Sequence, residues 1–293
     1  MWCAVRRFTI HHSPFTRYRL DLVPEDYFIG VDAHELERLR QQHAAWGPET
    51  RALWNAAGFG AGQHLADLGS GPGFSTLDLA ELVGPAGRVS AFDKASIYLG
   101  FLRDETHRRN LTNVDTVETD ISKVDVIGRD LDGAFCRFFL AFLIDDLDRV
   151  LKSVYDSLKP GGVLAAMEYL TVESATCSPP VRGFDAHTQA WVRYYAANGG
   201  DTRVGSILPA KLVRAGFTIA HASCVGGMAN PAHRWWAWWG RLMEDFGDRL
   251  VAEGLMNDDE LQGLRHDWRE VSGDPQAFIY TPILVQIVAR KDP

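Results

Sequence analysis

The stretch His64-Leu-Ala-Asp67-Leu-Gly69-Ser-Gly71-Pro-Gly73-Phe74 decides the fold of this chain. It is typical of a buried strand followed by a glycine-rich turn and the start of a helix. A second strand follows at Gly87-Arg-Val-Ser-Ala-Phe-Asp93 and ends in an acid. Such a unit holds a nucleotide-like ligand, because the turn lets backbone N–H groups approach the ligand and the acid accepts hydrogen bonds from a ribose diol.

The spacing of the glycines indicates which ligand this unit holds. Gly69, Gly71 and Gly73 follow the pattern G-x-G-x-G, whereas a dinucleotide-binding turn follows G-x-G-x-x-G/A. The last small position of that pattern is Phe74 here, and no Lys-Ser/Thr pair follows the loop, which excludes a P-loop. Pro72 suits a first helical turn, whose free N–H groups bind a carboxylate. A ligand with a carboxylate at one end and a ribose at the other therefore fits better than a diphosphate.

An ordered set of motifs resembles those of class I S-adenosylmethionine (SAM)-dependent methyltransferases. The motifs are Asp67-Leu-Gly-Ser-Gly-Pro-Gly73, Asp93 at the end of the next strand, Thr119-Asp120-Ile121, Asp132-Gly-Ala-Phe-Cys-Arg137 and Leu158-Lys-Pro-Gly-Gly162. The resemblance covers Tyr27 to Arg290, and its specificity lies in the cofactor half. It implies SAM as cofactor, S-adenosylhomocysteine as product, and a place in the small-molecule (natural-product or ubiquinone-type) group.

The same resemblance implies roles for individual residues of a cofactor site. Asp93 would hold the ribose hydroxyls, and Asp120 would accept from the adenine amino group with Ile121 beside the ring. Gly69 would line the methionine end. The full set of expected cofactor-binding residues is Tyr27, Gln42, Asp67, Gly69, Ser70, Gly71, Gly73, Asp93, Lys94, Asp120, Ile121 and Arg137.

Three of these residues also have structural interpretations. Asp93 suits the N-cap of the following helix, and Asp120 suits the cap of a turn. Arg137 either faces the ligand or the acceptor, or forms an ion pair with Asp145 or Asp146.

The alternation of strand and helix patterns predicts an α/β fold, a Rossmann-like doubly wound seven-stranded sheet with helical cap insertions. The resemblance implies that the last strand runs antiparallel between its neighbours. We expect an N-terminal segment and helical lid at 1–57 and a core at 58–293, with acceptor-side insertions at about 171–205 and 229–276. The expected strands are 64–68, 88–92, 114–118, 131–136, 162–169, 216–222 and 279–290, and the expected core helices are 73–83, 95–109, 145–158 and 207–214.

Residues 32–57 are interpreted as two helices broken at Gly47-Pro48. The pattern Glu35-x-x-Arg38-Leu39-x-x-Gln42 resembles the lead-in helix of small-molecule methyltransferases, which closes over the cofactor, often with an upstream tyrosine such as Tyr27. The alternative is an amphipathic cap helix whose polar side chains are solvated.

Aromatic residues in the two insertions predict an acceptor pocket. In the first insertion, Ser178-Pro-Pro180 excludes a helix, and Phe184 to Ala197 is typical of one. In the second, a stripe from Trp235 to Phe246 recurs at helical spacing. The stripe is either a packed helix face or an aromatic wall that attracts cations. The expected pocket residues are Tyr169, Trp191, Tyr195, Trp235 and Trp239.

Glu168 is the first candidate for a general base. Methyl transfer requires an aligned acceptor and excluded water, and an O- or N-acceptor can also need a base. Glu168 lies near the carboxyl end of the fifth expected strand, where open α/β sheets bind ligands, and its apolar neighbours would raise its pKa. The alternative is a structural carboxylate bonded to loop N–H groups. His187 and His233 are second candidates for the base.

Composition narrows the class of protein. The chain has 293 residues, 46% of them hydrophobic, and a net charge of −8 without a lysine or arginine run, which disfavours nucleic acid as a partner. No apolar run reaches the length of a membrane span, and Met1 to Leu20 lacks the apolar core of a secretory signal. The cysteines show no metal-ligand grouping and favour reduced thiols in the cytoplasm; they are Cys3, Cys136, Cys177 and Cys224.

The predicted function is methyl transfer from SAM to a small hydrophobic metabolite of secondary metabolism. The reaction is either O-methylation or C-methylation of an alkene, prenyl or aromatic acceptor with Glu168 as base. The alternatives are an NAD-dependent oxidoreductase on the same nucleotide-binding unit and a non-catalytic SAM-binding module. Met1 to Arg19 either packs on a second subunit, as in a homodimer, or stays disordered.

Overall fold

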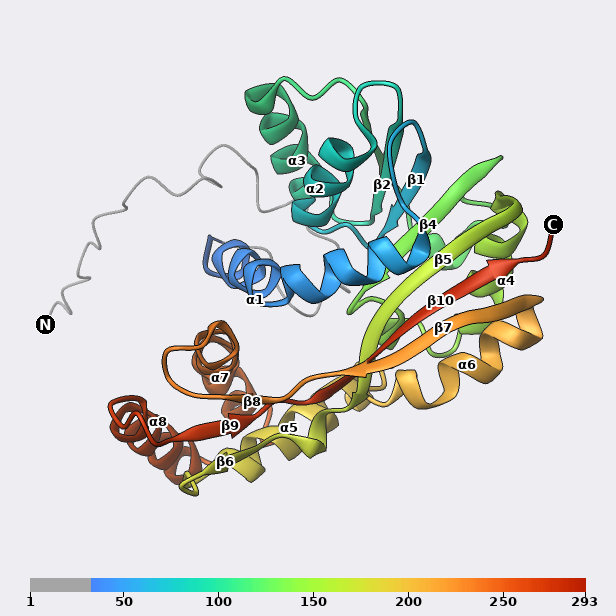
Figure 1. The fold of residues 1–293 in the computed structure, drawn as a ribbon. Coiled ribbons are helices and arrows are strands. Elements are labelled where there is room, and N and C mark those ends of the chain that lie inside the picture. The colour runs from blue at the N-terminus through green and yellow to red at the C-terminus, as the bar shows by residue number, and fades with distance from the viewer. Residues whose placement is uncertain (1–32) are drawn as a thin grey trace, which may run out of the picture.

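A seven-stranded sheet forms the centre of the structure (Figure 1). The computed structural model describes residues 33–293. The strands of the sheet are β1 His64–Leu68, β2 Arg88–Asp93, β3 Val114–Glu118, β4 Leu131–Arg137, β5 Leu158–Thr171, β7 Phe217–Val225 and β10 Ile283–Lys291. Across the sheet their order is β3-β2-β1-β4-β5-β10-β7, and β10 runs antiparallel to both neighbours. The expected fold class, including the antiparallel last strand, is confirmed.

The central strands are buried on both faces, which is why they form continuous apolar runs in the sequence. In β1, Leu65 to Leu68 are all buried, and so are the residues of β5 from Val163 to Tyr169. Two acids interrupt these runs: Asp67 is 2% exposed and Glu168 is 0% exposed. An acid in such a run has to be hydrogen-bonded or neutral, so both residues point to the site described below.

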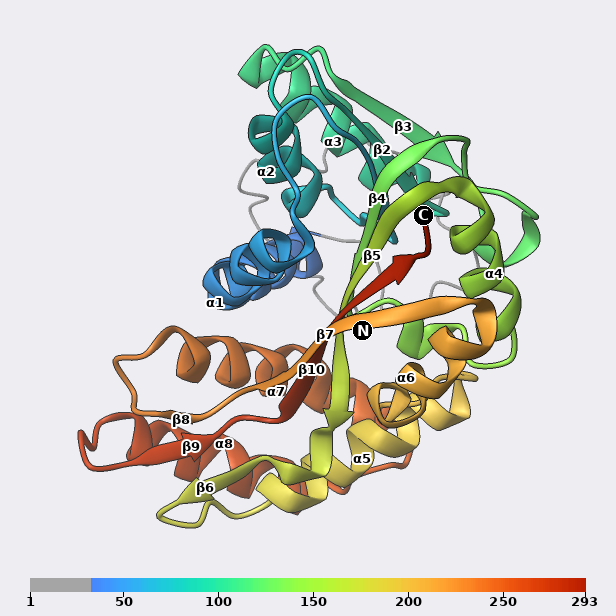
Figure 2. The same cartoon turned by 45° about the vertical axis from the view of Figure 1, so that its right-hand side comes forward.

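Helices cover both faces of the sheet (Figures 1 and 2). On one side lie α1 Ala33–Ala57, α2 Phe74–Val83 and α3 Ser96–Arg109, and on the other α4 Leu147–Ser157 and α6 Val204–Ala215. Short 3₁₀ turns follow β3, β4 and β5: η3 Ile121–Lys123, η4 Leu140–Phe142 and η5 Val172–Ser174. The strand order reverses between β1 and β4, and a doubly wound sheet binds ligands at such a point.

The insertions build a separate block at the end where β5, β10 and β7 run on beyond the other strands (Figure 2). It contains β6 Thr176–Ser178, α5 Phe184–Ala197, β8 Met228–Ala229, α7 Arg234–Ala252, α8 Asp258–Ser272 and β9 Phe278–Tyr280. The three short strands pair in the order β6-β9-β8. The expected helix at Phe184–Ala197 has the bounds of α5.

One expectation about the helices is wrong. α1 continues through Gly47-Pro48 as a single helix instead of breaking there. A proline inside a helix costs about 3 kcal/mol. Burial on both sides of the proline offsets this cost, because Trp46 is 0% exposed and Trp54 is 2% exposed.

The single strand expected at 279–290 is also wrong, because the chain divides there between two sheets. β9 ends at Tyr280 and β10 begins at Ile283. Pro282 has no backbone N–H to donate to a neighbouring strand. The N–H of Thr281 donates to the carbonyl oxygen of Gly227 at 2.9 Å, next to β8. Among residues 33–293, no helix combines the length and the apolar character that crossing a membrane requires.

Candidate active site

A cavity of about 390 Å³ lies at the carboxyl ends of β1, β2 and β4 and extends beneath α1 to α5. It brings together residues that are far apart in the sequence. The predicted site residues among its lining are Gln42, Asp67, Gly69, Ser70, Gly71, Asp93, Lys94, Asp120, Ile121, Arg137, Tyr169, Trp191 and Tyr195. Tyr27 lies outside the described residues.

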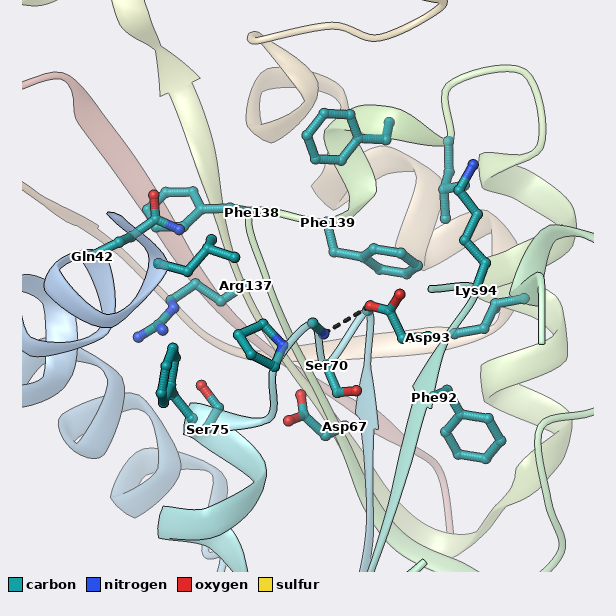
Figure 3. A pocket seen from close by; sticks show the side chains of 18 of the residues that line it. Gln42, Asp67, Ser70, Ser75, Phe92, Asp93, Lys94, Arg137, Phe138 and Phe139 are labelled. Atoms are coloured by element: carbon teal, nitrogen blue, oxygen red, sulfur yellow. Dashed lines mark hydrogen bonds between the residues drawn. The ribbon is translucent and has the colours of Figure 1, made fainter. Parts of the chain in front are cut away.

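The glycine loop folds back against the end of β2. Gly69 and Gly71 have positive φ angles of 66° and 53°, a region that favours glycine. A Cβ atom on Gly69 would lie 2.1 Å from the Phe139 ring, whereas one on Gly71 would meet no atom within 4 Å. The Gly71 N–H donates to Asp93 Oδ2 at 2.7 Å (Figure 3). The loop and Asp93, the last residue of β2, therefore form one corner of the cavity.

Asp93 is held by backbone N–H groups on both carboxylate oxygens. Besides the bond from Gly71, Oδ1 accepts from the Ala95 N–H at 2.8 Å, so the residue also fixes the turn into α3. Burial raises the pKa of the Asp93 carboxyl, although the N–H groups of Ala95 and Gly71 act in the opposite direction. Each carboxylate oxygen has a second lone pair, so Asp93 can still accept hydrogen bonds from a ligand.

Asp120 caps the turn after β3 and lines the cavity at the same time. Its Oδ1 accepts from the Ser122 N–H at 3.0 Å, and Lys123 lies 2.8 Å from Oδ2. Burial disfavours the charged carboxylate, but Lys123 and Ser122 outweigh it and lower the pKa of Asp120. Beside it, Ile121 is 3% exposed and offers an apolar surface.

The buried Asp67 and the partly buried Arg137 lie under the loop and attract each other. Asp67 Oδ2 accepts from Thr76 Oγ1 at 2.6 Å, and burial raises the pKa of Asp67 to about 6. Arg137 donates to Thr50 Oγ1 at 2.7 Å and lies 3.2 Å from His43 Nδ1. Burial lowers the pKa of Arg137 to about 10, although Asp67 acts in the opposite direction.

The alternative of an ion pair between Arg137 and Asp145 or Asp146 is wrong. Among the ion pairs of the described chain, Asp146 binds Arg149 at 2.6 Å, and no pair joins Arg137 to either acid. Arg137 instead lies in the cavity lining and ties β4 to α1.

The start of α1 covers the cavity with a buried ion pair. Glu35 and Arg38 are 6% and 4% exposed, so the alternative of solvated side chains is wrong for them. Arg38 Nε and Nη2 donate to the two Glu35 carboxylate oxygens at 2.6 Å each, and Nη1 donates to Gln42 Oε1 at 3.0 Å. Burial disfavours the charged guanidinium, but Glu35 outweighs it and raises the pKa of Arg38. The signal in the sequence was the i, i+3 spacing of the two charges.

Several predicted site residues do not line this cavity. Gly73 is required for packing, because a Cβ atom there would lie 2.4 Å from Leu102 Cδ1. The α7 stripe is a packed helix face: Trp235 contacts Trp46 with ring centroids 5.1 Å apart, and Trp239 contacts Phe184 at 5.9 Å. Leu242 belongs to the same stripe and does line the cavity, although it was not among the expected pocket residues.

The two candidate histidines lie in structural positions outside the lining. His233 is the N-cap of α7, and its Nδ1 accepts from the Trp235 N–H at 3.2 Å. His187 is 1% exposed, and neither of its ring nitrogens has a hydrogen-bond partner in residues 33–293. Burial lowers the pKa of His187 to about 4. Neither histidine lines the cavity, and their catalytic roles stay predictions.

The position of His187 predicts a pH-dependent stability. Because its pKa is about 4 in the folded chain and 6.5 is the ordinary value, its contribution is present above pH 6.5 and is lost as the pH falls toward 4. Between pH 7 and 4.5 this loss is on the order of 2 kcal/mol. Urea unfolding of His187→Leu should show a correspondingly flatter pH dependence than wild type. The exposed His266→Leu serves as control, and equal pH slopes in wild type and His187→Leu would contradict a buried neutral histidine.

Glu168 lies behind the cavity and holds the loop that follows β4. Its Oε1 accepts from the N–H groups of Phe139 and Leu140 at 2.8 and 2.7 Å. Burial raises the pKa of Glu168 to about 7, although those N–H groups act in the opposite direction. The carboxylate is absent from the lining of the cavity. Its role as base stays a prediction, and the contacts match the structural alternative.

That loop supplies aromatic residues which the sequence reasoning missed. Phe138, Phe139 and Phe142 line the cavity, and Phe138 has a φ of 55°, which is rare for a bulky residue. Phe138 contacts Tyr169 with ring centroids 4.8 Å apart, and Phe142 stacks on Tyr195 at 5.0 Å. The available signal was the apolar run Phe138-Phe-Leu-Ala-Phe-Leu143, placed where a strand ends at the ligand edge.

The sheet order, the glycine loop, the acid at the end of β2 and the acid after β3 define a Rossmann-like nucleoside-binding protein. Residues 65–162 match a family described as "Methyltransferase domain". The chain is 32% identical over 128 residues to the ubiquinone/menaquinone biosynthesis C-methyltransferase of Pseudoalteromonas translucida, covering 43% of this chain and 49% of the relative. It is 26% identical over 152 residues to the demethylmenaquinone methyltransferase of Listeria welshimeri, covering 52% and 60%. The chain spans about half the length of the curated relatives it matches.

Solved structures share the fold over most of the chain. The YcgJ protein of Bacillus subtilis has a TM-score of 0.56 at 14% identity, covering 86% of this chain and 99% of that one. Phosphoethanolamine N-methyltransferase 2 of Haemonchus contortus has a TM-score of 0.54 at 17% identity, covering 85% and 53%. The [4+2]-cyclase SpnF has a TM-score of 0.55 at 19% identity, covering 84% and 80%. The domain match and the relatives support a class I SAM-dependent methyltransferase, and the solved structures share its fold.

Proposed function

We propose that this chain binds SAM and transfers its methyl group to a small hydrophobic acceptor. The observation that carries the proposal is a single cavity with two different ends. The glycine loop, Asp93 and Asp120 form one end, and aromatic side chains including Tyr169 and Tyr195 form the other.

The first end fits SAM by charge and by hydrogen-bonding capacity. Asp93 can accept from the ribose, and Asp120 with Ile121 can hold the adenine. Ser70 Oγ is buried without a partner among the described residues, and the lining has more acids than bases. Such a lining suits a cationic ligand. When bound, SAM supplies a methyl group on a positively charged sulfur, which makes it electrophilic.

The second end fits an acceptor without net charge. Tyr169, Trp191 and Tyr195 are 3%, 3% and 4% exposed, so an acceptor there would be shielded from water. The charges Glu35 and Arg38 neutralise each other across two short hydrogen bonds. A carboxylated or phosphorylated acceptor beside this pair would therefore be desolvated without compensation from Arg38.

The residues of this chain contribute alignment and exclusion of water. Leu36 of α1 is 1% exposed and packs with Tyr98 of α3, which ties the start of α1 to α3. Holding two reactants within about 3.5 Å in a closed site accounts for much of the barrier reduction in such displacements. The name of the Pseudoalteromonas translucida relative, a C-methyltransferase, favours C-methylation, and O-methylation is the competing outcome.

Calorimetric titration with SAM and S-adenosylhomocysteine tests the cofactor, and mass spectrometry of a panel of acceptors tests the transfer. We expect micromolar binding of both ligands and a gain of one methyl group on neutral hydrophobic acceptors. Neutral and carboxylated forms of the same acceptor should be compared, with the neutral form preferred. Binding of neither ligand would overturn the proposal.

Two alternatives have specific observations in their favour or against them. A fold neighbour is named as a [4+2]-cyclase, so this fold also occurs in a protein with another activity; a non-catalytic SAM-binding module would show SAM binding without a methylated product. An NAD-dependent oxidoreductase is disfavoured, because Phe74 occupies the third small position and packs on Phe101 with ring centroids 6.0 Å apart. A rise in melting temperature with NADH and none with SAM would favour it.

A further inference from the structure

α1 contains a weak point between the part that covers the cavity and the part that is anchored to the sheet. Pro48 has no N–H, so the carbonyl of Ala44 loses its helical hydrogen bond, and Gly47 adds backbone freedom. Residues 33–46 carry the cavity-lining side chains Glu35, Arg38 and Gln42. Residues 49–57 follow the interruption.

The second part of α1 is tied firmly to the sheet. Gln286 of β10 donates to the carbonyl oxygen of Glu49 at 2.8 Å, and Arg137 of β4 donates to Thr50 at 2.7 Å. Trp54 packs edge-on against Phe135 with ring centroids 5.3 Å apart. A movement of the first part of α1 over the cavity would therefore pivot at the Gly47-Pro48 junction.

Two side chains span this junction from outside the helix, Arg137 of β4 through His43 and Thr50, and Arg234 of α7. Arg234, the first residue of α7, donates through Nε to the carbonyl oxygen of Ala45 at 2.6 Å and through Nη2 to Oε1 of Glu49. One contact lies before Pro48 and the other after it. We call this pair of contacts the Arg234 bridge. The guanidinium also lies over the Trp235 ring, 5.0 Å from its centroid, which fixes its orientation.

The same helix that provides the bridge also contacts the covering part of α1 and the cavity. Trp46 packs between Trp235 and Trp238 of α7, with ring centroids 5.1 Å from each. Further along α7, Phe246 lies 5.4 Å from the Arg38 guanidinium carbon, and Leu242 lines the cavity. α7 is therefore a continuous support from the junction to the acceptor end.

We propose that Arg234 is a positioning residue that holds the first part of α1 closed over the cavity by bridging the proline junction. The inference rests on the proposed function, because closure matters for SAM affinity and for exclusion of water. Charge-assisted hydrogen bonds of this kind are stronger than neutral ones. Without them the closed position should be less populated, and apparent SAM affinity falls with the closed fraction.

Hydrogen exchange of the full chain tests the bridge in Arg234→Ala and Arg234→Lys. We expect amides of 36–46 to exchange about tenfold faster in Arg234→Ala than in wild type, while amides of 50–57 exchange at the wild-type rate. In Arg234→Lys, the exchange rate of 36–46 should lie between those of wild type and Arg234→Ala. Arg241→Ala is the matched control, since Arg241 lies on the same helix and binds Asp245 at 2.6 Å, with no hydrogen bond or ion pair to α1 among residues 33–293. Calorimetry should show weaker SAM binding by Arg234→Ala and unchanged binding by Arg241→Ala.

The outcomes separate the bridge from the proposed function. Equal acceleration in 36–46 and 50–57 would mean general loosening and would overturn the proposal, as would no acceleration in either segment. If wild type fails to bind SAM, the proposed function is wrong, while the exchange data still decide whether Arg234 holds α1. Faster exchange confined to 36–46, with SAM affinity unaffected, would overturn the link to ligand binding.

Discussion

Asp93→Ala is expected to weaken SAM binding by about a hundredfold, since two hydrogen bonds to a carboxylate are each worth about 1.5 kcal/mol. The variant also removes the acceptor for the N–H groups of Gly71 and Ala95, so the glycine loop loses its anchor at β2. Isothermal titration calorimetry with SAM and with S-adenosylhomocysteine should show the same loss for both ligands, because they share the ribose.

Two further variants isolate the carboxylate. Asp93→Asn keeps the shape and one acceptor oxygen, so its affinity should lie between wild type and Asp93→Ala. Asp125→Ala makes the same change of charge at an exposed position outside the cavity lining and should bind as wild type does. Wild-type affinity in Asp93→Ala would place the ribose elsewhere and would contradict the assignment of this end of the cavity.

Glu168→Ala is expected to lower the free energy of unfolding by about 3 kcal/mol, because it leaves two buried N–H groups unpaired. Those N–H groups belong to Phe139 and Leu140, so the aromatic loop should shift and turnover should fall with it. Glu168→Gln keeps an acceptor oxygen and should keep turnover within about tenfold of wild type, since a positioning role does not need the charge. Chemical unfolding and steady-state kinetics measure the two effects.

The same pair of variants decides whether Glu168 is a general base. Loss of a base lowers kcat by about a hundredfold or more, so a loss of that size in Glu168→Gln at unchanged stability would establish the predicted catalytic role. The pH dependence gives a second readout. A folded-state pKa of about 7, above the ordinary 4.5, means that the contribution of Glu168 to stability is lost as the pH rises from 4.5 through 7. Glu168→Gln should therefore gain stability relative to wild type at pH 8 compared with pH 5.

The cofactor end of the cavity was predictable because its determinants are local. Glycines at positive φ, an acid at the end of β2 and an acid after β3 each follow from a short stretch of sequence, and the parallel sheet brings strand ends together without further information. For this reason Gly69, Gly71, Asp93 and Asp120 all line the cavity.

The acceptor end was predicted only in part because its determinants are not local. Periodicity marks Trp235 and Trp239 as one face of a helix, but it does not say what that face meets. In the structure it meets Trp46 and Phe184, and the cavity receives the loop after β4 instead. Glu168 illustrates the same limit, because the sequence places the acid at a strand end and leaves open which way its carboxylate points.

The sequence by itself determined the sheet, its glycine loop and the pair of acids, because these depend on backbone conformation and on hydrogen bonds between neighbours along the chain. Tertiary structure decided the rest. It kept α1 whole through Pro48, since packing of Trp46 and Trp54 on either side outweighs the lost helical hydrogen bond. Tertiary structure also buried the ion pair of Glu35 and Arg38. The i, i+3 spacing predicts that the two charges meet, but whether they are solvated or buried depends on what packs against the helix.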